Sequence, residues 1–175
     1  MPRAPSASSS STSTPSCGSA IASGRRARRS LAAAQAHTQA GAFEAALALL
    51  TSAEDGPLEE IHRARVELLR GQIAFLSSRG GDAPLQLLKA AVRLESLDFG
   101  LARVSYLEAL TAAMYAGRLA QGCTPREVGE AVISAPDAHQ PPGPADLLLD
   151  GLAVLTTAGH AAAAPALKAA VNAFR

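Results

Sequence analysis

The sequence predicts an all-α fold, a right-handed α-solenoid of about four helix–Gly–helix units. The first observation is an internal echo, because residues 88–92 and 167–171 both read LKAAV at a separation of 79 residues. That separation is twice a period of roughly 40 residues, the length of one two-helix repeat. The second observation is that glycines recur at a similar interval, at positions 41, 80, 117 and 159.

Composition also favours helices over sheets. Aromatic residues make up 3% of the 175 residues, while alanine is abundant. Small residues let helices approach closely, whereas a sheet sandwich needs many β-branched and aromatic positions. The net charge of +1 gives no general reason to expect direct nucleic-acid or membrane binding. No apolar run approaches the roughly 18 residues of a membrane span, and the two cysteines make no disulfide framework, so we expect a cytoplasmic protein.

The expected domain organisation is a disordered Ser/Thr/Pro-rich tail over residues 1–24, followed by one helical-repeat domain over residues 25–175. The tail has hardly an apolar side chain, so burial cannot offset the entropy of ordering it. Four arginines follow at positions 25, 26, 28 and 29. They could grip phosphate, but no basic stripe with interleaved aromatics continues the patch, so we favour a solvated first helical turn.

The first two predicted helices are separated by Gly41. The first runs to about Ala40, and a left-handed glycine ends helices at low cost. The second carries apolar residues at i, i+3, i+4 and i+7, which is an amphipathic spacing. These residues are Phe43, Ala46, Leu47 and Leu50.

The third predicted helix, from about Leu58 to Ser78, carries two apolar stripes about 140° apart. Two stripes imply two packing neighbours, as an internal solenoid helix requires. One stripe is Ile61, Ala64, Leu68, Gly71 and Phe75, and the other is Val66, Leu69, Ile73 and Leu76.

The fourth and fifth helices are expected over residues 83–95 and 101–116. Asp82 is placed to cap the fourth helix, and Pro84 lies in its first turn, where its missing N–H has no cost. The packing stripe of the fourth helix is expected to be Leu85, Leu88 and Val92.

The sixth helix has the strongest local signal. Thr124 can accept from the third helical amide, Glu127 can reach back to Thr124, and Pro125 suits the first helical position, so a capping box should begin this helix. It should end at residues 135–136. The seventh helix is expected to pack through Leu148, Leu152 and Leu155 and to end at Gly159, and the eighth carries the second pentapeptide.

Three residues are candidate groove contacts: Arg65, Gln72 and Tyr106. Arg65 and Gln72 lie in the narrow strip between the two stripes of the third helix, where they would face a concave surface. The alternative for Arg65 is an arginine that pairs locally or lays its stem over apolar surface. The alternative for Tyr106 is a core residue with a satisfied hydroxyl.

Motifs of catalysis are missing from the sequence. It has no Walker phosphate loop, no Gly-x-Ser-x-Gly elbow and no cysteine with a clear histidine partner. Cys123 and His139 lack zinc-ligand spacing, and Asp146 and Asp150 are explained by the helix dipole and solvent better than as an acid–base pair. We therefore expect no enzyme activity, no cofactor and no metal.

Around Gly41, small and bulky residues fall at Ala33, Ala34, Phe43, Ala46, Leu50 and Ala53, where a tetratricopeptide-like repeat places its packing residues. Together with this spacing, residues 26–34, 41–47, 63–75 and 147–153 resemble the helical middle region of large ATP-binding LuxR-type transcriptional regulators of high-GC bacteria. The resemblance implies a tetratricopeptide-like region that senses an inducer or partner between an ATPase module and a DNA-binding helix-turn-helix. No Walker motif or DNA-reading helix is present, so neither activity is carried over to a residue here.

Two functional hypotheses follow. The first is a non-catalytic interaction or sensing module, expected to be a fragment of such a regulator, because the segment 170–175 is a poor solenoid cap. The second is a standalone adaptor that binds a peptide or protein in its concave groove. The expected partner is a protein or peptide, such as the missing domains of a regulator, and the last helix is expected to self-associate through Val171 and Phe174.

Overall fold

A computed structural model describes residues 17–77, 81–117, 122–136 and 141–175. These residues form eight α-helices and no strand, so the predicted all-α class is confirmed for the described part of the chain. The helices are α1 (Cys17–Gln39), α2 (Phe43–Glu54), α3 (Glu60–Leu76), α4 (Ala83–Leu94), α5 (Phe99–Ala116), α6 (Pro125–Ser134), α7 (Pro144–Ala158) and α8 (His160–Ala173).

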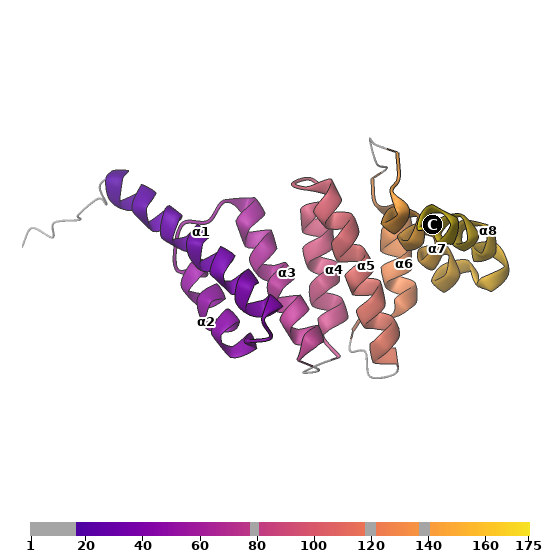
Figure 1. Ribbon diagram of the computed structural model, residues 1–175, viewed down its shortest axis with the longest axis horizontal. Coiled ribbons are helices and arrows are strands. Elements are labelled where there is room, and N and C mark those ends of the chain that lie inside the picture. Colours follow the sequence, from indigo (N-terminus) through magenta and orange to yellow (C-terminus); the bar gives the residue numbers. More distant parts are fainter. Residues whose placement is uncertain (1–16, 78–80, 118–121, 137–140) are drawn as a thin grey trace, which may run out of the picture.

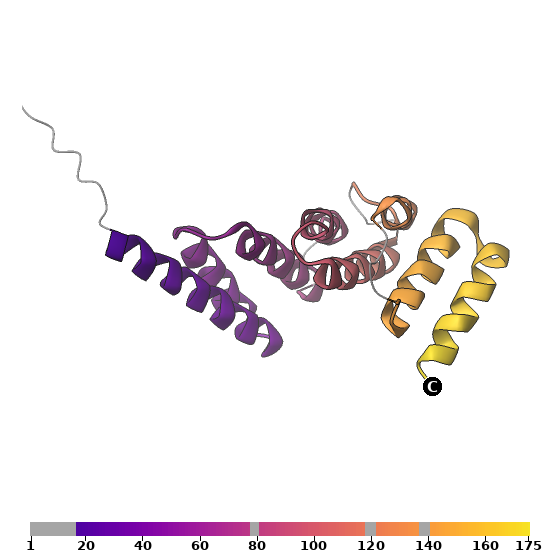
Figure 2. The same ribbon diagram turned by 90° about the horizontal axis from the view of Figure 1, so that it is seen from above.

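The helices follow one another along the long axis of the molecule in sequence order, from α1 and α2 at one end to α7 and α8 at the other (Figures 1 and 2). Each helix contacts the next one in sequence. The odd-numbered helices also contact one another, α1 with α3, α3 with α5, and α5 with α7. They therefore form a continuous layer of their own.

Helix α3 lies between two separate hydrophobic cores, as its two stripes predict. Val66, Leu69 and Ile73 are buried in the core that α3 shares with α1 and α2. Ala64 and Leu68 are buried on its other side, in a core shared with α4 and α5 that continues to α7. The two-stripe prediction is confirmed, although Leu76 at the end of the second stripe is exposed.

The predicted helix ends at glycine are confirmed where the structure describes them. Gly41, Gly117 and Gly159 have φ values of 74°, 51° and 87°, in the left-handed region that glycine adopts without a steric penalty. Gly80, the remaining glycine of the predicted period, lies outside the described residues.

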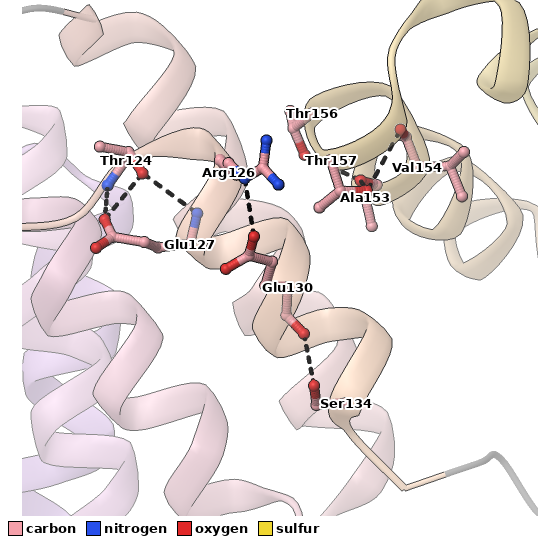
Figure 3. Close-up of polar contacts among 9 residues, drawn as sticks. All are labelled: Thr124, Arg126, Glu127, Glu130, Ser134, Ala153, Val154, Thr156 and Thr157. Carbon is pink, nitrogen blue, oxygen red and sulfur yellow. Dashed lines mark hydrogen bonds and ion pairs between the residues drawn. The ribbon is translucent and has the colours of Figure 1, made fainter.

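The capping box at the start of α6 is also confirmed (Figure 3). The Glu127 amide donates to Thr124 Oγ1 at 3.2 Å, and the Thr124 amide donates to Glu127 Oε2 at 2.7 Å. The Thr124 amide and, after it, the Thr124 hydroxyl both donate to the Glu127 carboxylate and lower the pKa of this carboxyl. Gly129, further along α6, lies so close to α7 that a Cβ there would be 3.1 Å from the Ala153 carbonyl oxygen. Glycine at this position lets the two helices approach closely.

Two helix pairs are packed through the same close contact. A Cβ on Gly71 of α3 would lie 2.9 Å from Leu87 Cδ2 of α4, and one on Gly151 of α7 would lie 2.7 Å from Leu167 Cδ2 of α8. These two glycine–leucine pairs are 80 residues apart, whereas the identical pentapeptides are 79 residues apart. Leu167 therefore occupies the packing position of Leu87, and the sequence echo is displaced from it by one residue.

The predicted packing stripe of α4 is wrong. Val92 is exposed and Leu85 and Leu88 are only partly buried. The fully buried positions are Leu87, Ala90, Ala91 and Leu94. Gly71 leaves room for Leu87, and the two alanines bring α4 close to its neighbours. Small residues therefore occupy buried positions of α4 that a search for large apolar residues does not identify.

Two further local predictions need correction. Asp82 precedes α4 but its side chain makes no capping hydrogen bond, because its backbone (φ −84°, ψ −17°) is already helical and not extended as in a capping residue. In α7 the predicted leucines are only half-buried, and the most buried residues are Leu149, Gly151 and Ala153.

Positions 1–16 of the predicted tail, which spans residues 1–24, lie outside the described residues. Helix α1 begins at Cys17, before the expected boundary at residue 25. Gly24 and Ala27 of this helix lie against Gly56 and Pro57 after α2, so the helix makes contacts on both sides of the expected boundary. Within the described residues, no helix combines the length and apolarity needed to cross a bilayer.

Candidate functional site

The layer of odd-numbered helices contains two adjoining cavities of 410 and 370 Å³, which we call the groove. Both cavities are lined by Gln35, Leu69 and Gln72, so they form one continuous depression. The wall residues come from α1 (Arg28, Leu31, Ala32, Gln35, Thr38, Gln39), α3 (His62, Arg65, Leu68, Leu69, Gln72, Phe75, Leu76), α4 (Leu87) and α5 (Leu101, Glu108).

The two main walls repeat the same residues at the same spacing. Arg28 and Gln35 of α1 precede Arg65 and Gln72 of α3 by 37 residues in each case. The small residues behind them also match, since Ala34 and Gly71 are separated by the same interval and both are buried. Small residues at these positions bring each helix close to its pair partner and leave the longer side chains facing the groove.

One end of the groove carries cations. Arg28 Nη1 is 3.7 Å from Glu59 Oε1, and Arg65 Nη2 is 3.5 Å from Asp98 Oδ2. Both arginine side chains are about half exposed. Ion pairs this long and this exposed are weak, so both guanidinium groups keep donors available. His62 lies beside them; its Nδ1 atom is buried, makes no hydrogen bond to a described residue and lies 3.6 Å from Glu59 Oε2.

The middle of the groove carries two glutamines in different states. Gln72 Nε2 donates to both carboxylate oxygens of Glu108, at 2.9 and 2.8 Å. Burial raises the pKa of Glu108, and the Gln72 hydrogen bond partly opposes that shift. Gln35 is exposed and makes no side-chain hydrogen bond to another described residue. Its amide therefore presents both a donor and an acceptor to the groove.

The other end of the groove is apolar. Phe75 and Leu76 line the second cavity, and the Phe75 ring packs against Tyr115 with ring centroids 6.1 Å apart and an interplanar angle of 56°. Tyr115 is 81% exposed and Leu76 is 55% exposed. The groove thus runs from a basic end, past the exposed Gln35 and the paired Gln72 and Glu108, to an end with exposed apolar side chains.

The three residues predicted from sequence do not all reach this site. Arg65 and Gln72 line the groove. Tyr106 does not, because it is buried in the core between α4 and α5, where its hydroxyl donates to the Glu95 carboxylate. Burial is the main cause of the raised pKa of this phenol. Its proposed groove contact is therefore wrong, and the alternative of a core tyrosine with a satisfied hydroxyl describes it.

Arg28 and Gln35 line the groove but are not among the residues predicted from sequence. The sequence prediction groups Arg28 with the other arginines of the first turn and does not single out Gln35. The signal that locates them is the interval of 37 residues that separates them from Arg65 and Gln72.

A series of arginine–acid pairs connects successive odd-numbered helices. Arg28 pairs with Glu59 before α3, Arg65 pairs with Asp98 before α5, and Arg103 pairs with Asp146 in the first turn of α7. Each cation therefore reaches the N-terminal end of the next odd-numbered helix. Arg65 accordingly has a structural role beside its place in the groove.

Arg103 makes the strongest contacts of this series. Its Nε atom is 3.1 Å from Asp146 Oδ1, one Nη atom is 2.5 Å from Asp150 Oδ1, and its side chain is 13% exposed. Asp146 and Asp150 are thus held by one arginine, a partner that the sequence prediction of helix dipole and solvent did not include. No group of three or more His, Cys, Asp or Glu side chains in the described residues is arranged to hold a metal ion.

Comparison with known proteins gave no match to a protein-family model, to a curated protein or to a solved structure.

Proposed function

We propose that the chain is a non-catalytic interaction module, a right-handed α-solenoid of about four tetratricopeptide-like helix pairs whose groove binds a peptide or protein segment. The observation that carries this proposal is the continuous groove along α1, α3 and α5, with arginine and glutamine repeated on two adjacent walls. Repetition of exposed polar residues at a packing interval is typical of a surface that follows an extended ligand.

The repeat architecture is supported by the packing of the helix pairs. The glycine–leucine contact of α3 and α4 recurs in α7 and α8, and the odd-numbered helices touch one another along the row. In a solenoid, each two-helix unit buries its apolar faces only against its neighbours. The two cores on either side of α3 fit this arrangement.

The non-catalytic part of the proposal is supported by the chemistry of the groove walls. Among the lining residues, Thr38 is the one hydroxyl, and its Oγ1 atom donates to the Ala34 carbonyl oxygen at 2.9 Å within α1. His62 lines the other cavity, and the carboxylate that lines the same cavity as Thr38, Glu108, accepts from Gln72 through both oxygens. Covalent catalysis needs a nucleophile and a base within hydrogen-bond reach.

The resemblance to LuxR-type regulators supplies a setting for the module. The segment 63–75, one of those that carry the resemblance, is also the central wall of the groove. We therefore place a sensing or partner-binding role of such a regulator first. A standalone adaptor that binds a peptide through the same wall is the second candidate.

The test is a selection of random 12-residue peptides on the intact chain, followed by fluorescence anisotropy of the enriched peptides. Ala32 is an exposed residue of α1 that lines the groove, so Ala32→Trp fills the groove without entering a core. Ala48 is an equally exposed alanine of α2 that does not line the groove, so Ala48→Trp is the matched control.

We expect Ala32→Trp to weaken binding of the selected peptides by about tenfold or more, equivalent to about 1.4 kcal/mol, while Ala48→Trp leaves it unchanged. Far-UV circular dichroism checks that both variants keep their helix content. Equal affinity of the two variants, or enrichment of no peptide at all, would contradict the proposal.

A further inference from the structure

We infer that the ligand of the groove is an extended peptide that carries acidic side chains about five residues away from a bulky apolar side chain. This inference rests on the proposed peptide-binding function and names the chemistry of the partner.

The acidic requirement comes from the basic end of the groove. Arg28 and Arg65 reach the same cavity from adjacent helices, and their present partners are 3.7 and 3.5 Å away. A ligand carboxylate at normal hydrogen-bond distance would bind these guanidinium groups more tightly than Glu59 and Asp98 do. Helix α1 adds no acidic residue, and it carries further arginines at positions 25, 26 and 29. The excess of positive charge at this end therefore selects acidic side chains.

The apolar requirement comes from the opposite end. Phe75 lies in the cavity wall, Leu76 is more than half exposed, and the Tyr115 ring extends the same surface from α5. Exposed apolar side chains that gather at the end of a groove mark an interaction site more strongly than scattered ones. A leucine or phenylalanine of the ligand would bury this surface.

The spacing follows from the length of α3 between the two ends. Arg65 and Leu76 are eleven residues apart on this helix, which at 1.5 Å per residue is about 16 Å. An extended peptide covers about 3.3 Å per residue. About five residues of ligand therefore separate the acidic anchor from the apolar anchor.

Gln35 lies between the two ends, since it lines both cavities. Its free amide has one donor side and one acceptor side, which match the N–H and C=O groups of an extended peptide backbone. This contact is independent of ligand sequence. It favours an extended strand over a helix, because the backbone groups of a helix are already paired.

The experiment uses synthetic fluorescein-labelled peptides in which a pair of glutamates and one phenylalanine stand two, five or eight positions apart, with Gly/Ser residues between them. Binding to the intact chain is measured by fluorescence anisotropy at 50 and 500 mM NaCl. A peptide with glutamine in place of both glutamates, and one with lysine, are the ligand controls.

We expect the five-residue spacing to bind at least about fivefold more tightly than the other two, and the glutamine peptide to bind about tenfold more weakly. Arg65→Gln and Arg28→Gln should each remove most of the preference for glutamate, as should the higher salt concentration. Arg126→Gln is the matched arginine control, because Arg126 is exposed on α6 and pairs with Glu130 away from the groove (Figure 3).

The other two contacts have matched controls as well. Tyr115→Ser should weaken the phenylalanine peptide by about threefold or more, while Ile133→Ser, at another exposed apolar residue on α6, should not. Gln35→Leu should weaken all peptides by a similar factor, whereas Gln86→Leu on exposed α4 surface should not.

The inference is overturned if the glutamate, glutamine and lysine peptides bind alike, or if Arg28→Gln and Arg65→Gln, both folded by circular dichroism, leave the glutamate preference intact. These failures differ from failure of the proposed function. If library-selected peptides are sensitive to Ala32→Trp but lack the acidic and apolar pattern, the groove binds peptides of another chemistry. If they are insensitive to Ala32→Trp, the groove is not the binding site.

Discussion

The pair formed by α3 and α4 and the pair formed by α7 and α8 are built on the same contact but bury different surfaces. Ala91 and Leu94 of α4 are completely buried. The residues 80 positions later are Val171 of α8 and Phe174 directly after it, which are 55% and 62% exposed. The internal packing of the pair is therefore the same, and the state of its outer face depends on what lies next to it.

The neighbour that makes this difference is α5. It shares with α4 the core that contains Ala91, Leu94 and Tyr106. No described helix covers the corresponding face of α8. Whether a position is buried thus depends more on which helices lie beside the pair than on the residues of the pair itself. Substitutions at corresponding positions of the two pairs should therefore have unequal effects on stability.

The largest expected difference in stability is between aspartate substitutions at Leu94 and at Phe174. Leu94→Asp places a carboxylate in the shared core and should destabilise the chain by about 4 kcal/mol or more, enough to unfold it. Phe174→Asp should change the free energy of unfolding by less than about 0.5 kcal/mol, because its side chain is already mostly exposed. Urea unfolding followed by circular dichroism measures both.

The same two surfaces differ in their expected effect on association. Phe174→Asp and Val171→Lys should lower self-association in sedimentation velocity while helix content is kept. If these two substitutions unfold the protein as Leu94→Asp does, the outer face of α8 is covered and the comparison fails.

The next largest difference in stability is expected between the loss of Arg103 and the loss of Arg28, the arginines at the two ends of the series of arginine–acid pairs. Arg103→Met leaves Asp146 and Asp150 close together without their partner and should destabilise the chain by about 2 kcal/mol. Arg28→Met removes a long, exposed pair and should cost less than about 0.5 kcal/mol. Thermal denaturation of the two variants in parallel measures the two losses of stability. A larger loss of stability for Arg28→Met than for Arg103→Met would contradict the prediction.

A smaller effect tests whether the two glycine–leucine contacts are equivalent. Alanine is favoured over glycine within a helix by about 1 kcal/mol, but a Cβ at Gly71 or Gly151 would crowd the leucine opposite it. We expect a net loss of about 1 kcal/mol for Gly71→Ala and a similar loss for Gly151→Ala. Gly100→Ala is the control, because a Cβ there meets no atom closer than 3.8 Å, and it should stabilise the chain slightly.

The smallest effect concerns Gln72 of α3, which donates to Glu108 in the layer of odd-numbered helices. The residue of α7 that corresponds to Gln72 is Leu152, 80 positions later. Burial raises the pKa of Glu108 above its ordinary value of 4.5, so the folded chain holds a proton that the unfolded chain releases. Stability should therefore fall as the pH rises through the window above 4.5. Glu108→Gln should be more stable than the parent at pH 7, and this difference should vanish below pH 4. A difference that persists below pH 4 would show that the effect is not protonation.

Local signals carried the prediction of helix positions. Gly41, the capping box of Thr124 and Glu127 and the two stripes of α3 depend on residues within one or two turns, and each is found in the structure. The packing stripe of α4 depends on which helices lie beside it, and hydrophobicity alone assigned it wrongly. Alanine and glycine are the residues that decide close packing here, and they give a weak signal in an alanine-rich chain.

The groove was partly accessible from sequence for the same reason. Arg65 and Gln72 are polar residues between the two apolar stripes of α3. This local pattern indicates that their side chains point into neither of the two cores. Tyr106 looks similar in isolation but lies on the side of α5 that faces α4, where it contacts Glu95. Arg28 and Gln35 become visible only when α1 and α3 are aligned through Ala34 and Gly71, an alignment that the pentapeptide echo does not supply.

The most direct test of the groove is hydrogen–deuterium exchange of the intact chain with and without a peptide from the selection. If the peptide binds as proposed, amide exchange should slow in segments of α1, α3 and α5 and stay unchanged in α6 and α8. Protection centred on α8, or spread over the even-numbered helices without α1 and α3, would contradict the assignment of the groove as the binding site.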